Sequence, residues 1–115
     1  MPEVKRSEIY QVDLDPVRGS ELRNTRPAVI VSSDAINNKA ATVIVCPITD
    51  AFGKESPIHV LLSAGEGGLT KESVAHCGQI RSIDKERLVK KLGSLDAFKM
   101  AKISKGLKEA LAINL

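Results

Sequence analysis

The segment from residue 18 to residue 34 constrains the fold of this chain more than any other. Its first half is polar and contains Gly19, which is typical of a loop or a tight turn. Its second half, Ala28–Val31, is a short apolar run rich in β-branched residues, which predicts a buried strand. Pro27 stands at the junction and pushes Arg26 into an extended conformation. The sequence therefore places a guanidinium at a rigid strand end beside a polar loop, an arrangement suited to an anion such as phosphate.

Similar apolar runs, separated by Pro, Gly and Asp, recur along the chain. They predict strands at Ile9–Leu14, Ala28–Val31, Ala41–Ile48, Ile58–Leu62, Glu72–Ile83 and Leu88–Leu92. Pro47 lacks a donor for the sheet, so we expect an edge or a bulge there. Gly78 interrupts the longest run and predicts a bulge or a close backbone approach.

Two segments favour helices. Ser33 and Asp34 predict the N-cap of a short helical turn that ends at Asn37. Asp96 predicts the start of a longer helix that reaches about Asn114. Its apolar stripe consists of Met100, Ile103, Leu107 and Leu111, and its solvated face carries Lys99, Lys102, Lys105 and Lys108. Many short strands and one terminal helix predict a mainly β fold, either a small β-barrel or a strongly bent antiparallel sheet with the helix packed on it.

Length and composition limit the classes of protein that the chain can represent. Its 115 residues suffice for one domain, so we expect a single domain over residues 1–115, and the 43% hydrophobic content can supply a core. The net charge of +3 and the pI of about 9.0 favour a polyanionic partner. Aromatic residues make up only 3%, which argues against a site built from stacked aromatic platforms.

The two cysteines and the N-terminus indicate a compartment. Cys46 and Cys77 lie in apolar runs and are expected to be buried free thiols of a cytosolic protein. The N-terminus lacks the apolar region of a signal peptide, and no apolar run is long enough to span a membrane. We therefore expect a cytoplasmic location and no membrane partner.

The sequence contains no pattern for a metal or cofactor site. His59 and His76 have no Cys, His or Asp at ligand spacing, and there is no P-loop, nucleophile elbow or dinucleotide fingerprint. We therefore expect no cofactor and a metal-free reaction. RNA cleavage fits this expectation because RNA carries its own nucleophile, the 2′-hydroxyl. A protein that promotes it must help to remove that proton, protonate the leaving 5′-oxygen and stabilise charge on phosphorus.

An ordered set of motifs resembles the MazF/PemK (Kid) family of toxin endoribonucleases. The set comprises Tyr10, Val12, Leu14, Asp15, Pro16, Gly19, Ser20, Glu21, Arg26–Ser32, Asn37, Pro47–Thr49, Gly68, Leu69, Ser73, Val74, Gln79–Arg81, Ile83, Asp84, Arg87, Leu88, Leu92, Gly93 and Leu95. It covers nearly the whole chain in order. The resemblance implies an SH3-like barrel of the type shared by MazF and the CcdB toxins, working as a homodimer.

The resemblance also implies a function. The chain is expected to be the toxin of a type II toxin–antitoxin system and a metal-independent, sequence-specific endoribonuclease. It would cut single-stranded RNA, by resemblance mRNA, to 2′,3′-cyclic phosphate and 5′-hydroxyl ends. Its partner would be a cognate antitoxin whose acidic, disordered tail hides Arg26. Two alternatives remain open: a toxin of the same fold that binds a protein, as the gyrase-poisoning relatives do, and a catalytically weak RNA-binding relative.

Two residues are the catalytic candidates that the resemblance implies. The family places an essential arginine before this proline, so Arg26 is expected to clamp the scissile phosphate. A guanidinium pKa above roughly 12 suits an electrostatic role better than acid catalysis. The family's catalytic Thr or Ser corresponds to Thr49, whose hydroxyl would stand at a strand end. Without the motifs, Arg26 is an ordinary surface arginine and Thr49 a residue of high β propensity.

Four more residues are predicted to bind RNA. Ser20 and Glu21 lie in the polar loop, where Glu21 could orient Arg26, accept a proton or contact a base. On the long strand, Arg81 could add positive charge near phosphate, and Gln79 could read a base edge. The alternatives are a solvated loop carboxylate and the polar outward face of a strand.

Position 78 departs from the family pattern. Relatives often carry an acidic residue there, which serves in some as the base, and this chain has Gly78. Either Thr49, Glu21 or a histidine then accepts the proton, or the enzyme is slower. His76 lies on the same strand face as position 78 if no bulge intervenes, and His59 is the other histidine. A lone histidine on a strand is more often structural.

Overall fold

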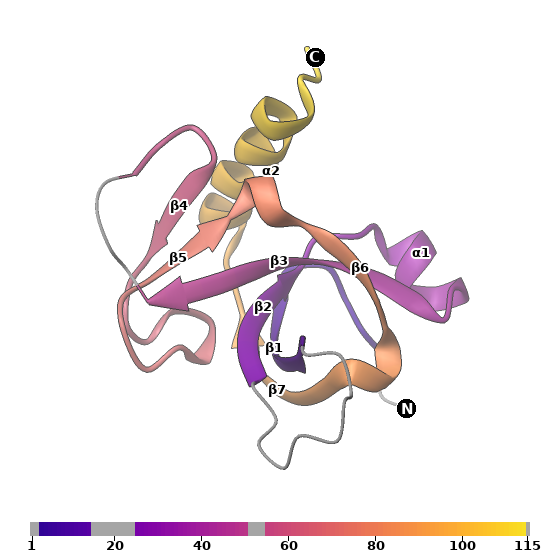
Figure 1. The fold of residues 1–115 in the computed structure, drawn as a ribbon. Coiled ribbons are helices and arrows are strands. Elements are labelled where there is room, and N and C mark those ends of the chain that lie inside the picture. Colours follow the sequence, from indigo (N-terminus) through magenta and orange to yellow (C-terminus); the bar gives the residue numbers. More distant parts are fainter. Residues whose placement is uncertain (1–2, 15–24, 51–54, 115) are drawn as a thin grey trace.

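The computed structural model describes residues 3–14, 25–50 and 55–114 (Figure 1). In chain order, these residues form β1 (Glu8–Asp13), β2 (Thr25–Ile30), α1 (Asp34–Lys39), β3 (Thr42–Asp50), β4 (His59–Leu62), η1 (Glu66–Gly68), β5 (Ser73–His76), η2 (Cys77–Gln79), β6 (Arg81–Asp84), η3 (Lys85–Arg87), β7 (Leu88–Ser94) and α2 (Ala97–Leu111). The η elements are short 3-10 helical turns.

The strands form one antiparallel sheet organised around β3. Its order is β4-β5-β3-β2-β1-β7, and β6 pairs with β3 outside this path. One edge of β3 pairs with β2, while the other pairs first with β6 and then with β5 (Figure 1). The predicted mainly β fold with a C-terminal helix is confirmed. Within the described residues no ladder joins β7 to β4 or to β6, so the sheet is not a closed barrel and the SH3-like barrel is unconfirmed.

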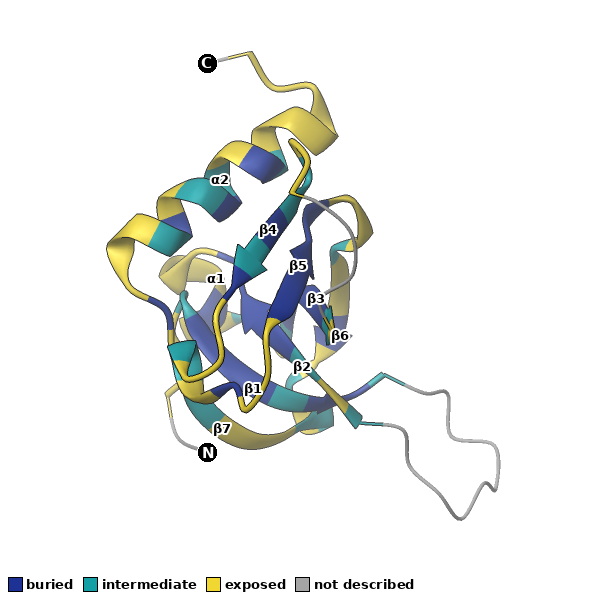
Figure 2. Cartoon of the chain, turned by 90° about the vertical axis from the view of Figure 1, so that its left-hand side faces the viewer, coloured by how far each residue is buried: buried dark blue, intermediate teal, exposed yellow. Residues whose placement is uncertain are grey.

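Side-chain alternation along the strands separates two hydrophobic cores. The first lies between the sheet and α2 and includes Ile9, Val29, Cys46, Ile48, Cys77 and Ile103. The second lies on the opposite face, inside the curve of β1, β2, β3 and β6, and includes Val12, Ala28, Ile30, Val43, Val45 and Ile83. Neighbouring residues of one strand therefore serve different cores, as the two-residue period requires. Figure 2 shows the buried side of α2 turned toward the sheet.

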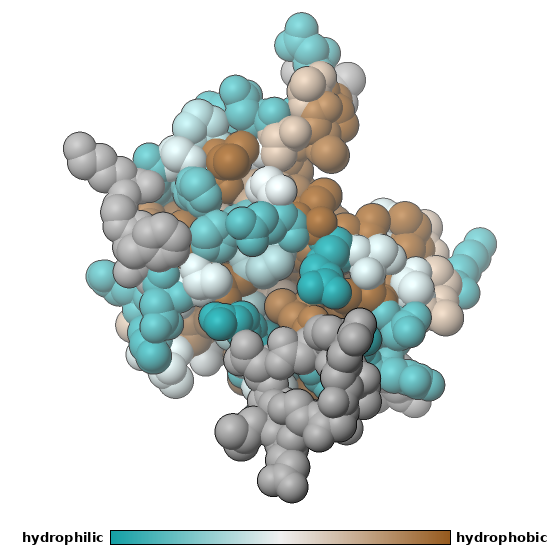
Figure 3. Space-filling model, in the orientation of Figure 1, coloured by the Kyte–Doolittle hydropathy of each residue, from teal (hydrophilic) through white to brown (hydrophobic). Residues whose placement is uncertain are grey.

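The helix α2 begins as predicted and ends earlier. The Asp96 side chain accepts a hydrogen bond from the Lys99 N–H at 2.9 Å. The helix ends at Leu111 rather than near Asn114, because Ala112 adopts a left-handed conformation with φ 57°. Leu111 is 54% exposed, so the end of the predicted stripe does not pack. Hydrophobic surface is visible at this end of the helix in Figure 3.

The lysines of α2 are not uniformly solvated, contrary to the prediction. The Lys99 side chain is only 16% exposed and donates to the Leu61 carbonyl at 2.9 Å. It also lies 3.7 Å from the Glu66 carboxylate. Lys99 therefore ties the helix to β4 and η1, and its ammonium reaches polar groups over the apolar edge of the sheet.

The helix α1 continues through the asparagines that were expected to stop it. Ser33 caps it as predicted, accepting a hydrogen bond from the Ile36 N–H at 3.3 Å. Asn37 is buried, however, and its amide donates to the Ser32 carbonyl and to the Asp34 carboxylate, both at 3.1 Å. Because its polar groups are satisfied inside the fold, Asn37 does not compete with the helix backbone.

The long strand predicted over Glu72–Ile83 is two strands separated by the turn η2. The turn carries Gly78 and moves the chain from one part of the β3 edge to another. Pairing of β3 with β6 ends at Val45, and pairing with β5 begins at Ile48. Pro47 was expected at an edge or a bulge, but it lies in this gap of a central strand. The Ile44 C=O accepts from the N–H groups of Val31 and Ser32, just after β2, and the Ile44 N–H donates to the Ser32 hydroxyl. Because backbone groups alternate sides along a strand, the Pro47 nitrogen points away from β2 and toward the gap, where no ladder donor is needed.

The expected free thiols are confirmed, since Cys46 and Cys77 are both buried and unbridged. No helix in the described part of the chain has the length and apolar character needed to cross a membrane.

Candidate active site

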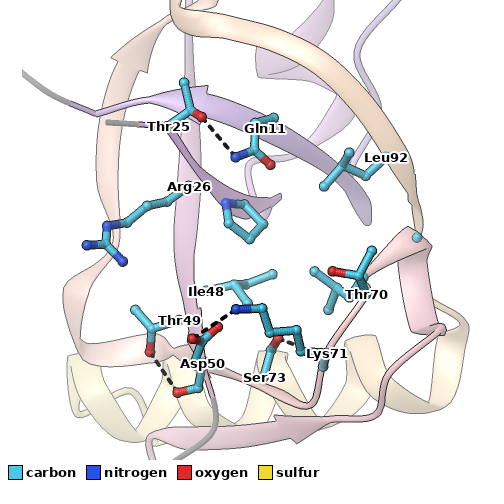
Figure 4. Close-up of a pocket in the computed structure, with 13 residues that line it drawn as sticks. Gln11, Thr25, Arg26, Ile48, Thr49, Asp50, Thr70, Lys71, Ser73 and Leu92 are labelled. Atoms are coloured by element: carbon cyan, nitrogen blue, oxygen red, sulfur yellow. Dashed lines mark hydrogen bonds and ion pairs between the residues drawn. The ribbon is translucent and has the colours of Figure 1, made fainter. Parts of the chain in front are cut away.

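A pocket of about 580 Å³ opens where the N-terminal end of β2 and the C-terminal end of β3 approach the segment from Gly68 to Ser73 (Figure 4). Its polar lining includes Gln11, Thr25, Arg26, Thr49, Asp50 and Lys71. Its apolar lining includes Pro27, Ile48, Leu69 and Leu92. The pocket is thus a cleft in which polar and charged side chains stand beside an apolar patch, so it can hold a ligand that has both polar and apolar parts.

Sheet register brings the two predicted catalytic residues together. The β2–β3 ladder pairs Ala28 with Pro47 and Val29 with Cys46. Continued by two residues into the pocket, the same register sets Arg26 opposite Thr49. Figure 4 shows both side chains on one side of the pocket, with Leu92 and Thr70 on the other. The Arg26 side chain is exposed and Thr49 is half-buried.

The backbone of Arg26 is held by its pairing with β1. Arg26 lies opposite Val12, and Pro27 lies opposite Gln11. The Gln11 amide donates to the Thr25 hydroxyl at 3.0 Å, which links the two strands beside the pocket. The strand begins at Thr25, three residues before the predicted start, because the β1 ladder continues past Pro27. The guanidinium therefore projects from a paired strand rather than from a loose end.

Thr49 has a histidine partner. Its hydroxyl oxygen lies 2.8 Å from Nε2 of His76, the last residue of β5, and 3.5 Å from the Asp50 carbonyl. His76 is 7% exposed, and its ring meets that of His59 edge to face, with centroids 5.0 Å apart. Burial, and then the charge of His59, lower the pKa of His76 below the ordinary 6.5. A lowered pKa leaves the imidazole neutral at pH 7, with one nitrogen able to accept a proton.

The pocket also contains a cation that sequence analysis did not single out. Lys71 lies 3.3 Å from the Asp50 carboxylate, and the Ser73 hydroxyl donates to the Lys71 carbonyl at 2.9 Å. The Lys71 and Asp50 side chains are 68% and 75% exposed, so their ion pair contributes at most about 1 kcal/mol. An incoming phosphate can therefore compete for Lys71. Only its position after the turn at Gly65–Gly68 could have suggested a role for this lysine.

Gln79 and Arg81, two of the residues predicted to bind RNA, do not line this pocket. Gln79 lies in η2 and Arg81 opens β6 opposite Val45, and both are exposed outside the pocket lining. Ser20 and Glu21 lie outside the described residues. No group of three or more His, Cys, Asp or Glu suited to a metal ion occurs among the residues that the structure describes.

Comparison with known proteins places the chain in a family. A family model described as "PemK-like, MazF-like toxin of type II toxin-antitoxin system" matches residues 5–111. The chain belongs to this PemK/MazF toxin family. The resemblance seen in the sequence motifs is thereby confirmed, and the chain is a MazF-type toxin.

Two similar family members are named as endoribonucleases. The chain is 44% identical to Endoribonuclease MazF9 of Mycobacterium tuberculosis over 110 residues, which cover 91% of this chain and 93% of that protein. It is 40% identical to Endoribonuclease MazF of Staphylococcus epidermidis over 112 residues, which cover 96% and 93%.

Solved structures of the family share the fold. An endoribonuclease from a mycobacterial species, solved in complex with its cognate antitoxin, superposes with a TM-score of 0.79 at 25% identity, covering 100% of this chain and 99% of the other. The MazE-MazF structure from Deinococcus radiodurans (Form-II) gives a TM-score of 0.81 at 24% identity, covering 99% and 100%. The open sheet with its C-terminal helix is thus a MazF-like fold.

Proposed function

We propose that this PemK/MazF-family toxin is an endoribonuclease that cuts single-stranded RNA in the Arg26–Thr49 pocket. The observation that carries the proposal is the meeting of a guanidinium and a histidine-bonded hydroxyl, from adjacent strands, in one open cleft. The two relatives at 44% and 40% identity, both named as endoribonucleases, support the same activity.

The chemistry follows from the substrate and these two groups. The RNA 2′-hydroxyl attacks the adjacent phosphorus, the bond to the 5′-oxygen breaks, and the products carry a 2′,3′-cyclic phosphate and a 5′-hydroxyl. Arg26 offers a planar fork of donors to the phosphate oxygens and stabilises the charge that develops on them. Thr49 contacts the reacting hydroxyl. The scheme uses no metal ion, and base contacts outside the pocket select the cut sequence.

We also propose that the toxin works as a homodimer with a cognate antitoxin. The fold neighbours include an endoribonuclease solved with its cognate antitoxin and a MazE-MazF structure. An antitoxin segment with acidic side chains would complement the net charge of +3 and cover the exposed Arg26. Mixing toxin with its antitoxin should therefore block access of RNA to the pocket.

The test is cleavage of a long single-stranded RNA by the purified toxin in excess EDTA. Wild type should give discrete cuts, and Arg26→Ala should lower kcat by about 10²–10³-fold, the usual effect of losing one preorganised donor to the transition state. Arg26→Lys is the matched control, because it keeps the charge and loses the bidentate fork. An Arg26→Ala protein as active as wild type would refute the assignment of the site.

The same assay separates the rival functions. RNA that stays intact with wild type, together with trapped gyrase–DNA complexes, would establish a protein-binding toxin. Tight RNA binding without cleavage would establish a non-catalytic RNA-binding relative. Cuts that appear only after added Mg²⁺ would contradict the metal-free scheme and leave the endoribonuclease assignment intact.

A further inference from the structure

A row of polar side chains crosses three adjacent strands behind the pocket. Thr49 on β3 meets His76 on β5 at 2.8 Å, and the His76 ring meets that of His59 on β4. The His59 Nδ1 atom lies 2.7 Å from the Ser56 hydroxyl. The β4–β5 register pairs the two histidines directly, so the sheet itself fixes their contact. Of this row only Thr49 lines the pocket.

Burial restricts the groups that the His76 ring can contact, and its Nε2 atom faces the Thr49 hydroxyl. His76 is 7% exposed and ends β5 immediately before η2, and β5 lies between β4 and β3 in the sheet. When neutral Nε2 accepts the Thr49 proton, the lone pairs of the Thr49 oxygen are available to the pocket. An unassisted threonine hydroxyl is a weak base, whereas a hydroxyl bonded to an imidazole can pass a proton on.

We propose that His76 is a positioning residue and proton relay of the active site, which acts on RNA through the Thr49 hydroxyl. This inference rests on the proposed endoribonuclease function. Gly78 has no side chain to serve as a base, and His59, the other histidine, does not line the pocket. His76 thus supplies proton-accepting capacity from behind the strand rather than from within the cleft.

The relay balances in protons and bonds. As the 2′-oxygen forms its bond to phosphorus, its proton passes to the Thr49 oxygen, and the original Thr49 proton passes to His76 Nε2. The phosphorus–5′-oxygen bond breaks, and the leaving oxygen takes a proton from water. The His76 imidazolium then returns its proton to water, so one proton has moved in net terms from the 2′-oxygen to the 5′-oxygen.

The relay requires a neutral imidazole, which sets the pH dependence. Three titratable residues lie on the elements around His76. They are His59 on β4, Asp50 next to Thr49 on β3, and Cys77 in η2, whose sulfur points to α2. Beyond His59, Glu55 and Lys102 pair with each other at 3.9 Å. Burial and the charge of His59 lower the pKa of His76, so the rate should fall only below the ordinary histidine pKa of 6.5.

Three variants test the relay against a merely structural histidine. His76→Leu removes the acceptor and should lower kcat by about 10²-fold or more, the usual contribution of a general base, at unchanged KM. His76→Gln keeps a polar group near the Nε2 position and should restore part of the rate without the acid limb of the pH profile. His59→Gln removes the neighbouring charge and should move the acid limb to higher pH.

The outcomes distinguish this inference from the function on which it rests. If wild type does not cut RNA, the proposed function fails and the relay fails with it. If wild type cuts RNA but His76→Leu and His76→Gln both stay within twofold of it with the same pH profile, only the relay is overturned. In a double-mutant cycle, the variant that carries both His76→Leu and Thr49→Val should be no slower than Thr49→Val alone. Losses of kcat that add between the two substitutions would also overturn the relay. Should His76→Leu fail to fold, the pH profile of His76→Gln decides.

Discussion

Replacing Gly93 with alanine should destabilise the fold severely through packing alone. A Cβ at Gly93 would lie 2.6 Å from the Gly67 carbonyl carbon, 2.7 Å from its oxygen and 3.0 Å from the Gly68 nitrogen. Ordinary contact begins at 3.4 Å, so β7 and η1 would have to separate by 0.8 Å (3.4 − 2.6). The obstructing atoms are backbone and cannot turn away as a side chain could.

The magnitude follows from the cost of overpacking. Inserting a methyl group into a filled site costs about 1–3 kcal/mol, and a backbone obstruction puts Gly93→Ala near the upper limit. A domain of this length has a free energy of unfolding of roughly 6–17 kcal/mol. With a urea m-value of about 2 kcal/mol/M, a loss of about 3 kcal/mol lowers the unfolding midpoint by about 1.5 M.

Gly65→Ala is the matched control. Gly65 has φ +95°, but a Cβ there would meet nothing within 4 Å. Gly65→Ala therefore measures the cost of backbone strain alone, about 1–2 kcal/mol. Gly93→Ala measures the cost of packing alone, because Gly93 has no left-handed φ. Both variants are compared with wild type by urea unfolding at one protein concentration. A Gly93→Ala loss below about 1 kcal/mol, or below that of Gly65→Ala, would refute the reasoning.

Local sequence signals predicted those elements that depend on local physics. The alternation of Ile9–Leu14 and the β-branched runs located β1, β2, β3 and β7 to within a few residues. Asp96 located the start of α2 because capping involves only the next turn. The helix end was missed since it depends on the left-handed Ala112, a residue without a strong preference for that conformation.

The parts of the site that depend on strand register could not be predicted from one sequence. The apolar run through Cys77 has the pattern of a continuous strand, and only the change of partner along β3 requires the turn η2. The sequence motifs indicate Arg26 and Thr49 separately, and only the register of the β2–β3 ladder sets them opposite each other. The Thr49–His76 contact requires the β3–β5 pairing, which no spacing in the sequence encodes.

Two further predictions concern the scaffold. The Asp34 carboxylate accepts the Arg6 N–H at 2.7 Å and the Asn37 amide, and these bonds hold its pKa below the ordinary 3.8. A depressed pKa stabilises the fold above pH 3.8. The difference in the free energy of unfolding between wild type and Asp34→Asn should therefore shrink as the pH falls below that value. Urea titrations at a series of pH values would measure this difference. The hydrogen bond with Cys77 and burial raise the pKa of Cys46, which leaves its thiol unreactive in the folded protein. Iodoacetamide should therefore modify Cys46 only as fast as the protein unfolds, and mass spectrometry would measure this rate. Faster labelling of the folded protein would contradict the burial of Cys46.

The gap at Pro47 separates two regions of the β3 edge, one paired with β6 and the other paired with β5. Arg81 is paired with Val45 and Thr49 with Val74, so their β3 positions are four residues apart, about 13 Å along the strand. Arg81 is on β6 and Val74 is on β5, and the turn η2 separates these two strands in the chain. Val45 belongs to the second core, whereas Ile48 belongs to the first. In the proposed scheme, a phosphate bound by Arg26 and Thr49 lies at the far end of this span, about 13 Å along β3 from the position opposite Arg81. If Arg81 contacts RNA, it does so at a nucleotide removed from the cut, where it adds binding energy rather than transition-state stabilisation.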